Sequence, residues 1–314
     1  MKPPGKAPHS FIILTGPTGV GKSELGVLLA KRLNAEIISA DSMQVYRYFD
    51  IGSAKPSEEM RRRVPHHLID AVDPSDEYNA NIFRSDAEAL IARLREEGKT
   101  PLVVGGTGLY LKALTQGLDC AVKPDISVRQ QIMMEMREKG VERMHEELAV
   151  ADPDSAQSIK PRDKSRIVRA LEVYRVTGRP LSYFHQRDRE KENPPCPAAL
   201  FVLNMPRKDL YARIDRRVDA MLAVGLVEEV RGLLEKGYSP DLKPFQGLGY
   251  KQVLPYLAGE CDYETMVQAI KQETRHYAKR QLTWFRKMEG AVWVDIEEGE
   301  DREEVAKRIL WHFS

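Results

Sequence analysis

A short segment near the N-terminus has the residue types and spacing of a phosphate-binding loop. It matches the pattern GxxxxGK[ST], and it lies between an apolar stretch at residues 11–14 and a helical pattern from about Lys22 to Leu33. In such a loop the glycines let backbone N–H groups converge on a phosphate chain, and the positive end of the helix favours the same anion. Lys22 would add a cation, and the hydroxyl of Ser23 is placed to hold Mg²⁺. The predicted phosphate-binding residues are Gly16, Pro17, Thr18, Gly19, Val20, Gly21, Lys22 and Ser23.

The absence of an acid after one predicted strand restricts which phosphorylated ligand the loop is expected to hold. Nucleoside triphosphatases with this loop hold Mg²⁺ partly through an aspartate at the end of a neighbouring apolar strand. The corresponding apolar stretch, residues 102–104, ends in Gly105, Gly106 and Thr107 and carries no acid. The loop could therefore hold a diphosphate group without acting as an ATPase.

Asp41 is a carboxylate that follows an early predicted strand, residues 36–39. Open α/β sheets place their ligands at the carboxyl ends of their strands. A carboxylate there could bind Mg²⁺ through water, or it could accept a proton from a nucleophile that attacks the ligand. Alternatively, Asp41 caps the next turn, which is a common structural use of this residue type.

The elements that must position these residues alternate between strand and helix. Apolar stretches at 11–14, 36–39 and 102–104 are separated by helical patterns at 22–33 and about 80–97. Strands that are apolar throughout are typical of parallel sheets covered by helices. The predicted fold class is therefore α/β, a parallel sheet of the P-loop NTPase type flanked by helices.

The middle of the chain predicts an all-helical insertion domain. From about Asp119 the apolar strands end and charged helical stretches follow, until apolar stretches return at 199–203 and 291–294. We expect residues 1–118 and 199–314 to form the α/β core with C-terminal helices, and residues 119–198 to form the insertion. Its helices are expected near residues 127–139, 141–149 and 163–176.

The composition is that of a soluble globular protein. Of the 314 residues, 42% are hydrophobic and 30% are charged, which excludes disordered and fibrous classes. No apolar run approaches the roughly 20 residues that span a bilayer, so we expect no membrane association and a cytoplasmic location. The three cysteines, Cys120, Cys196 and Cys261, are too far apart in the sequence to indicate a zinc site or a disulfide framework.

The charges are unevenly distributed along the chain. The net charge is only +1, but residues 160–191 hold ten Lys or Arg against four acids, and residues 271–287 hold six against one. Each block alone could be an ordinary charged helical surface. The two blocks together favour a polyanionic partner.

Seven segments, in order along almost the whole chain, resemble motifs of the bacterial tRNA dimethylallyltransferase family. They are residues 16–23, 41–46 (DSMQVY), 50–56 (DIGSAKP), 105–110 (GGTGLY), 169–172 (RALE), 249–252 (GYKQ) and 279–285 (KRQLTWF). The resemblance implies transfer of a dimethylallyl group from dimethylallyl diphosphate to the exocyclic amine of an adenosine. That adenosine lies immediately 3′ of the anticodon in tRNAs that read codons beginning with U. The partners are thus tRNA, through its anticodon stem-loop, and dimethylallyl diphosphate, with Mg²⁺ as cofactor, and we expect a monomer.

The resemblance also assigns roles to single residues. Asp41 would be the general base, and Lys22 would stabilise the departing diphosphate, with Ser23 holding Mg²⁺. Arg217 resembles the catalytic arginine that the family directs at the active centre; alternatively, it is a solvated residue on an amphipathic helix. The residues expected to contact tRNA are Asp41, Ser42, Met43, Gln44, Thr107, Arg129, Ser165, Arg166, Ile167, Val168, Arg169, Gln246, Gly249, Tyr250, Lys251, Lys279, Arg280 and Gln281. Ser165 stands where the family usually has glutamine, which weakens the expected contact at that position.

Three other functions are compatible with part of the pattern. A P-loop kinase of a nucleoside or small metabolite would use the same loop, but it leaves the two basic blocks unexplained. An isopentenyltransferase acting on free adenine nucleotides would share the chemistry but would not need those blocks. A non-enzymatic RNA-binding protein would leave Asp41 without a use.

Overall fold

The computed structural model describes residues 10–117, 122–123, 125–190 and 198–313, which form two compact units. One unit comprises residues 1–115 and 196–314, and the other comprises residues 116–195. We refer to them as the core and the helical unit. No described helix is both long enough and apolar enough to cross a membrane.

The core contains a six-stranded sheet in which every strand pair is parallel, as predicted. The strands are β1 (Phe11–Thr15), β2 (Ala35–Ser39), β3 (His66–His67), β4 (Thr100–Val104), β5 (Ala198–Asn204) and β6 (Val292–Asp295). Their order across the sheet is β3-β2-β4-β1-β5-β6, so β1 lies between β4 and β5. The loops that follow β1, β2 and β4 therefore meet at one edge of the sheet.

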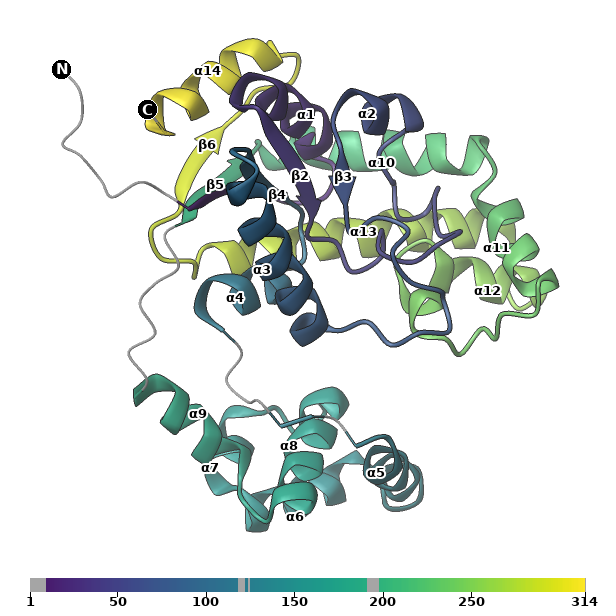
Figure 1. Ribbon diagram of the computed structural model, residues 1–314. Helices are drawn as coiled ribbons and strands as arrows, with labels where there is room; N and C mark the ends of the chain where they lie inside the picture. Colours follow the sequence, from purple (N-terminus) through teal and green to yellow (C-terminus); the bar gives the residue numbers. More distant parts are fainter. Residues whose placement is uncertain (1–9, 118–121, 124, 191–197, 314) are drawn as a thin grey trace. The chain divides into compact units, whose positions relative to one another are not determined.

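Helices cover both faces of this sheet. Figure 1 shows α1 (Lys22–Leu33) and α14 (Arg302–Phe313) on one side, and α3 (Ala80–Glu96) and α4 (Gly108–Gln116) on the other. The remaining elements of the core are α2 (Glu58–Arg63), α10 (Arg207–Ala223), α11 (Leu226–Glu235), the 3₁₀ helix η1 (Lys243–Gln246), α12 (Tyr250–Leu257) and α13 (Tyr263–Phe285). Helix α13 packs against both α10 and α12.

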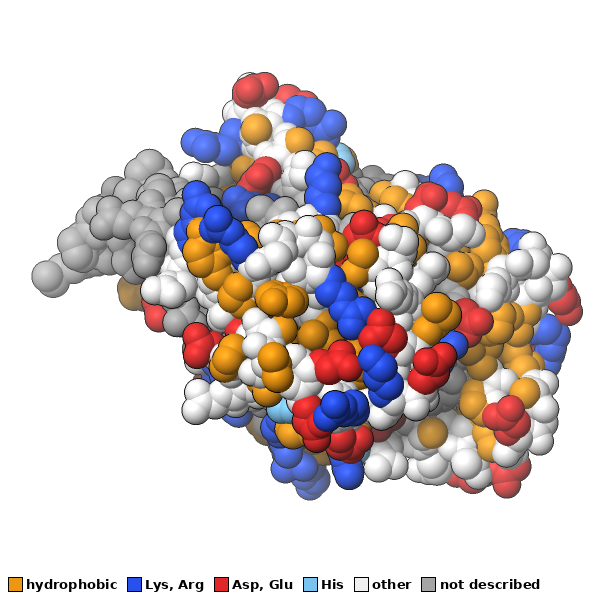
Figure 2. All heavy atoms as spheres, turned by 90° about the horizontal axis from the view of Figure 1, so that it is seen from below, with side chains coloured by type: hydrophobic (Ala, Val, Ile, Leu, Met, Phe, Trp, Pro, Cys, Tyr) orange, Lys and Arg blue, Asp and Glu red, His pale blue; other side chains and the backbone are white. Residues whose placement is uncertain are grey.

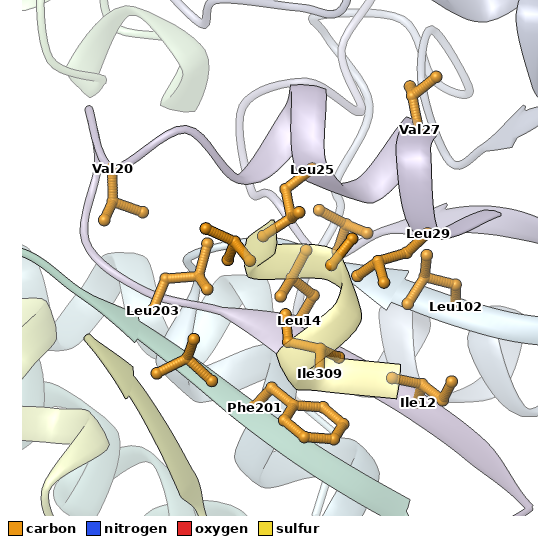
Figure 3. Close-up of a cluster of buried hydrophobic side chains, with 14 of the residues drawn as sticks. Ile12, Leu14, Val20, Leu25, Val27, Leu29, Leu102, Phe201, Leu203 and Ile309 are labelled. Atoms are coloured by element: carbon orange, nitrogen blue, oxygen red, sulfur yellow. The ribbon is translucent and has the colours of Figure 1, made fainter. Parts of the chain in front are cut away.

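The main hydrophobic cluster fixes α1 against the strand that precedes it. Leu14 of β1, Leu25 and Leu29 of α1, and Ile309 of α14 are fully buried and lie together in this cluster (Figure 3). Burying a side chain of this size stabilises the fold by about 1.5–3 kcal/mol relative to leaving it exposed. The phosphate-binding loop, which joins β1 to α1, is thus held at both ends by packed elements.

The helical unit has a hydrophobic core of its own. Its helices are α5 (Ile126–Lys139), α6 (Val141–Ala151), α7 (Pro153–Ser158), α8 (Lys164–Thr177) and α9 (Leu181–Glu190). Side chains such as Ile132, Met144 and Leu171 pack together in this core. Arg175 of α8 binds both carboxylate oxygens of Glu135 on α5, at 2.7 and 2.9 Å.

One strand was missed by the sequence analysis. Strand β3 has only two residues, and both are histidines, so neither periodicity nor apolar content could reveal it. His67 Nε2 lies 2.6 Å from Glu36 Oε2 on the neighbouring strand β2, and His66 Nδ1 lies 2.7 Å from the Val64 carbonyl oxygen. Both histidines therefore have structural contacts at the edge of the sheet.

Charges of both signs cover the surface. On the face shown in Figure 2, basic and acidic side chains lie next to one another, in keeping with the net charge of +1. Exposed pairs one helical turn apart occur among the described residues, such as Arg62 with Glu58 and Arg84 with Glu88. Such pairs contribute little to stability.

Candidate active site

The loop from Gly16 to Gly21 has the backbone that a phosphate-binding loop requires. Gly16, Gly19 and Gly21 have φ angles of 148°, 83° and 98°, which residues with side chains rarely adopt. A Cβ atom at Gly16 would also lie 2.6 Å from the Leu203 carbonyl oxygen. The glycines of the motif are therefore needed for its shape, and α1 begins directly after the loop.

Lys22 folds back onto this loop. Its Nζ donates hydrogen bonds to the carbonyl oxygens of Gly16, at 2.8 Å, and Pro17, at 2.9 Å. Burial and, to a smaller extent, the charge of Arg217 lower the pKa of Lys22 to about 7, although the charge of Asp41 opposes both effects. A bound anion near Lys22 would thus strongly favour the charged form of this side chain.

Arg217 reaches the same loop from α10. Its Nη1 donates to Thr18 Oγ1 at 3.3 Å. Burial lowers the pKa of Arg217, and the charge of Asp41 partly offsets this effect. The structure therefore brings together the three residues predicted to be catalytic, from β1–α1, β2 and α10.

Asp41 lies directly beyond the end of β2, and one of its oxygens caps the following turn. Oδ1 accepts hydrogen bonds from the backbone N–H groups of Met43, at 2.9 Å, and Gln44, at 3.3 Å. In the described part of the chain, no donor is paired with Oδ2. The capping alternative is thus observed, and it leaves the second oxygen for another partner.

A cavity of about 940 Å³ opens from the phosphate-binding loop, and Lys22, Asp41 and Arg217 all line it. This volume is at the upper end of the range for small-molecule sites. Several residues predicted to contact tRNA also line it, namely Ser42, Met43, Gln44, Gln246, Gly249, Lys251, Arg280 and Gln281. The cavity is therefore lined by cations at the loop and by motif residues farther out.

Thr107 ties the Asp41 loop to the end of β4. Its Oγ1 accepts a hydrogen bond from Ser42 N at 3.0 Å and donates to Ser42 Oγ at 3.4 Å. The hydroxyl is thus engaged within the protein. The tRNA contact expected of Thr107 remains a prediction.

Tyr277 on α13 is a cavity residue that the sequence analysis missed. It lines the cavity near Asp41. Burial raises the pKa of Tyr277, and the nearby charge of Asp41 raises it further, so the phenol stays protonated. Its position one helical turn before Gln281 was the available signal.

Glu229 on α11 was also missed, although it organises the far side of the cavity. Its carboxylate accepts from the N–H groups of Asp50, Ile51 and Gly52, at 3.1, 2.8 and 3.3 Å, and from the Tyr250 hydroxyl at 2.6 Å. Tyr250 is completely buried by this arrangement. The predicted contact between the Tyr250 side chain and tRNA is therefore wrong, because the ring lies in the core.

Gln44 and Gln281 have side-chain amides that are already bonded within the protein. Gln44 Nε2 donates to the carbonyl oxygens of Ser53 and Ala54, at 3.3 and 3.2 Å. Gln281 is buried, and it bridges the phosphate-binding loop and the end of β4. Their tRNA contacts remain predictions, and both amides also hold the walls of the cavity.

The remaining predicted tRNA contacts differ in exposure. Lys279 is exposed on α13, and Ser165 and Arg166 are exposed on α8. Arg129 is half-buried on α5, and Arg169 bonds to Glu172 at 2.9 Å.

Two predicted tRNA contacts in the helical unit need correction. Ile167 and Val168 are buried in the hydrophobic core of that unit, so their side chains cannot meet RNA. The sequence motif alone could not distinguish the buried face of α8 from its exposed face.

The protein offers few ligands for a metal ion. The described residues contain no cluster of three or more His, Cys, Asp or Glu side chains that could hold one. Ser23 and Asp41 do line a common recess of about 40 Å³ beside the loop. This pairing fits Mg²⁺, which usually keeps several waters and takes its other ligands from substrate phosphates.

Comparisons with known sequences give a consistent result. A family model described as IPP transferase matches residues 44–288, and one described as isopentenyl transferase matches residues 9–70. A tRNA dimethylallyltransferase of Pelotomaculum thermopropionicum is 45% identical over 300 residues, which cover 95% of each chain. The tRNA dimethylallyltransferase 1 of Trichlorobacter lovleyi is 49% identical over 283 residues, which cover 90% of this chain and 92% of that protein.

Solved structures give the same result. The full-length tRNA isopentenylpyrophosphate transferase of Bacillus halodurans is similar with a TM-score of 0.70 and 37% identity, covering 96% of this chain and 95% of that one. A eukaryotic dimethylallyltransferase acting on tRNA is similar with a TM-score of 0.74 and 31% identity, covering 91% of this chain and 73% of that one.

Proposed function

We infer that this chain, which belongs to the tRNA dimethylallyltransferase family, transfers a dimethylallyl group from dimethylallyl diphosphate to an adenosine of tRNA. The observation that carries the inference is the convergence of Lys22, Arg217 and Asp41 on one cavity that starts at the phosphate-binding loop. The acceptor that we propose is the exocyclic amine of the adenosine immediately 3′ of the anticodon, in tRNAs that read codons beginning with U.

The phosphate-binding loop acts on the leaving group. The bond between the allylic carbon and the phosphate oxygen breaks, and the diphosphate departs with the electron pair. Backbone N–H groups of the loop, the Lys22 ammonium and the Arg217 guanidinium stabilise the charge that builds up on the diphosphate. When bound at the Ser23 hydroxyl, Mg²⁺ would neutralise further charge on the diphosphate oxygens.

Asp41 acts on the nucleophile. The adenine amine is a poor nucleophile, and it forms the new bond to the allylic carbon as its proton passes to the carboxylate. The two backbone hydrogen bonds to Oδ1 hold the carboxylate in place, so that Oδ2 can face the amine. The residue that caps the turn and the general base are then the same side chain.

The tRNA reaches this site by extruding the target base from the anticodon-loop stack. We propose that the core contacts tRNA through Ser42, Met43, Gln246, Gly249, Lys251, Lys279 and Arg280. Six of these seven residues line the cavity, and Lys279 is exposed on the same helix as Arg280. In the helical unit we propose contacts from Arg129, Ser165, Arg166 and Arg169, which would mainly bind phosphates.

The positions of the cavity residues in the chain support assigning catalysis to one part of the chain and tRNA contact to another. Every lining residue comes from positions 18–60, 106 or 213–281. We therefore propose residues 1–118 and 199–314 as the catalytic part and residues 119–198 as an insertion that contacts tRNA. We further propose that the enzyme works as a monomer in the cytoplasm.

Labelled dimethylallyl diphosphate tests the proposal directly. The enzyme is incubated with an unmodified anticodon stem-loop that carries adenosine 3′ of the anticodon, and with AMP and ATP as competing acceptors. Label in the stem-loop alone is expected. Label in the nucleotides alone would indicate an adenylate isopentenyltransferase, and transfer of labelled γ-phosphate from ATP to a small acceptor would indicate a kinase.

A further inference from the structure

A side chain from the far end of the sequence occupies a backbone donor near the start of the phosphate-binding loop. Gln281 Oε1 accepts a hydrogen bond from Thr18 N at 2.8 Å, and Gln281 Nε2 donates to the Gly106 carbonyl oxygen at 2.8 Å. Gln281 lies 263 residues from Thr18 in the sequence and is only 6% exposed. Both ends of its amide are therefore fixed.

The amide oxygen of Gln281 lies where an anion would bind. In a phosphate-binding loop the backbone N–H groups point at phosphate oxygens. An oxygen 2.8 Å from Thr18 N takes up the place that a phosphate oxygen would have at this end of the loop. The Thr18 amide is then not available to a ligand.

We propose that Gln281 is a specificity-determining residue that limits this loop to two phosphates and so disfavours nucleoside triphosphates. The proposal rests on the diphosphate substrate inferred above and extends it to how the loop rejects a longer phosphate chain. Arg217 bonds to the Thr18 hydroxyl and would attract any polyphosphate. Charge would attract both a diphosphate and a triphosphate. The preference for a diphosphate must therefore come from the space that Gln281 fills.

The end of β4 agrees with this proposal. A Cβ atom at Gly105 would lie 2.2 Å from the Ala40 carbonyl oxygen, and one at Gly106 would lie 2.4 Å from Gln281 Nε2. Nucleoside triphosphatases place a metal-binding aspartate on the equivalent strand. Here the strand end has no room for an acid, so packing excludes the usual metal ligand of a nucleoside triphosphate.

Direct binding of inorganic pyrophosphate and tripolyphosphate tests the proposal. We would measure both affinities by calorimetry, at one fixed concentration of free Mg²⁺, for the wild type and for Gln281→Ala. The wild type should prefer pyrophosphate. Gln281→Ala should reduce that preference about tenfold, because it opens the space and frees a backbone donor for a charged ligand.

Two further variants act as controls. Gln281→Met fills nearly the same volume without the amide, and it should keep most of the preference for pyrophosphate. Gln272→Ala makes the same truncation at an exposed position of the same helix, and it should leave both affinities unchanged. If Gln281→Ala does not fold, Gln281→Asn should shift the preference in the same direction by a smaller factor.

The outcomes separate this inference from the proposed function. An unchanged preference in folded Gln281→Ala, or an equal shift in Gln272→Ala, would overturn the role of Gln281. The role of Gln281 would also be overturned if the wild type transferred dimethylallyl to the stem-loop but bound tripolyphosphate as tightly as pyrophosphate. Failure of that transfer would instead overturn the proposed function, because neither binding measurement depends on turnover.

Discussion

The ammonium of Lys22 lies in surroundings that disfavour its charge. Burial, together with the charge of Arg217, lowers its pKa to about 7. A diphosphate in the loop would favour the protonated form, so binding of pyrophosphate at pH 8 should take up a proton at Lys22. Calorimetry in two buffers of different ionisation enthalpy measures that uptake. Lys22→Arg stays charged at this pH, so it should take up fewer protons when it binds pyrophosphate. Equal proton uptake in both proteins would contradict the assignment of the uptake to Lys22.

At the same scale, Asp41 combines two roles that a conservative substitution can separate. Asn at position 41 keeps an oxygen that can accept from Met43 N and Gln44 N, but it cannot take a proton from the amine. We expect Asp41→Asn to fold and to bind pyrophosphate normally, while transfer slows by about 10²–10⁴-fold. Single-turnover transfer to the stem-loop measures the loss. Turnover close to that of the wild type would rule out the base.

At the scale of elements, the end of β4 depends on having no side chains. A Cβ at Gly105 would meet the Ala40 carbonyl oxygen at the end of β2. Gly105→Ala should therefore push the two strands apart and lower the free energy of unfolding by about 1–3 kcal/mol. Gly232→Ala on α11 is the matched control, because nothing lies within 4 Å of its Cβ position and alanine favours helix. Denaturant unfolding measures both variants, and equal stabilities would contradict the crowding.

The elements also show what sequence could and could not predict. The phosphate-binding loop and Asp41 could be predicted because a local motif and the apolar strands that precede them mark their positions in the sequence. Gln281 and Glu229 contact residues 263 and 177–179 positions away, and only the folded sheet brings these partners together. The motif that contains Tyr250 was recognised, but a motif does not say which of its side chains is buried.

At the scale of the whole molecule, small-anion binding should depend on the core alone, whereas tRNA binding should depend on both units. Arg166 is exposed on α8, and its charge would bind an RNA phosphate. Arg166→Gln should weaken tRNA binding and reduce its dependence on salt by about one phosphate contact, while pyrophosphate binding is unchanged. Arg143→Gln, an exposed residue of α6 paired with Glu146, is the control. Filter binding at several salt concentrations gives the slope of log affinity for tRNA against log salt for each variant. The same slope for Arg166→Gln and Arg143→Gln would show that Arg166 does not contact tRNA.

The carboxylate of Glu229 has a consequence for exchanging parts between relatives. It joins the loop at residues 50–52 to Tyr250, so three separate stretches of chain meet at one acidic group. A chimera that replaced α11 and α12 together would retain the cavity wall only if the new segment carried both a glutamate and a tyrosine at these positions. Replacing α11 alone with a segment that lacks the glutamate would leave three backbone N–H groups and the buried Tyr250 hydroxyl without their acceptor. Replacing α12 alone with a segment that lacks the tyrosine would remove one donor from the Glu229 carboxylate. The two helices and the loop must therefore be transplanted as a set.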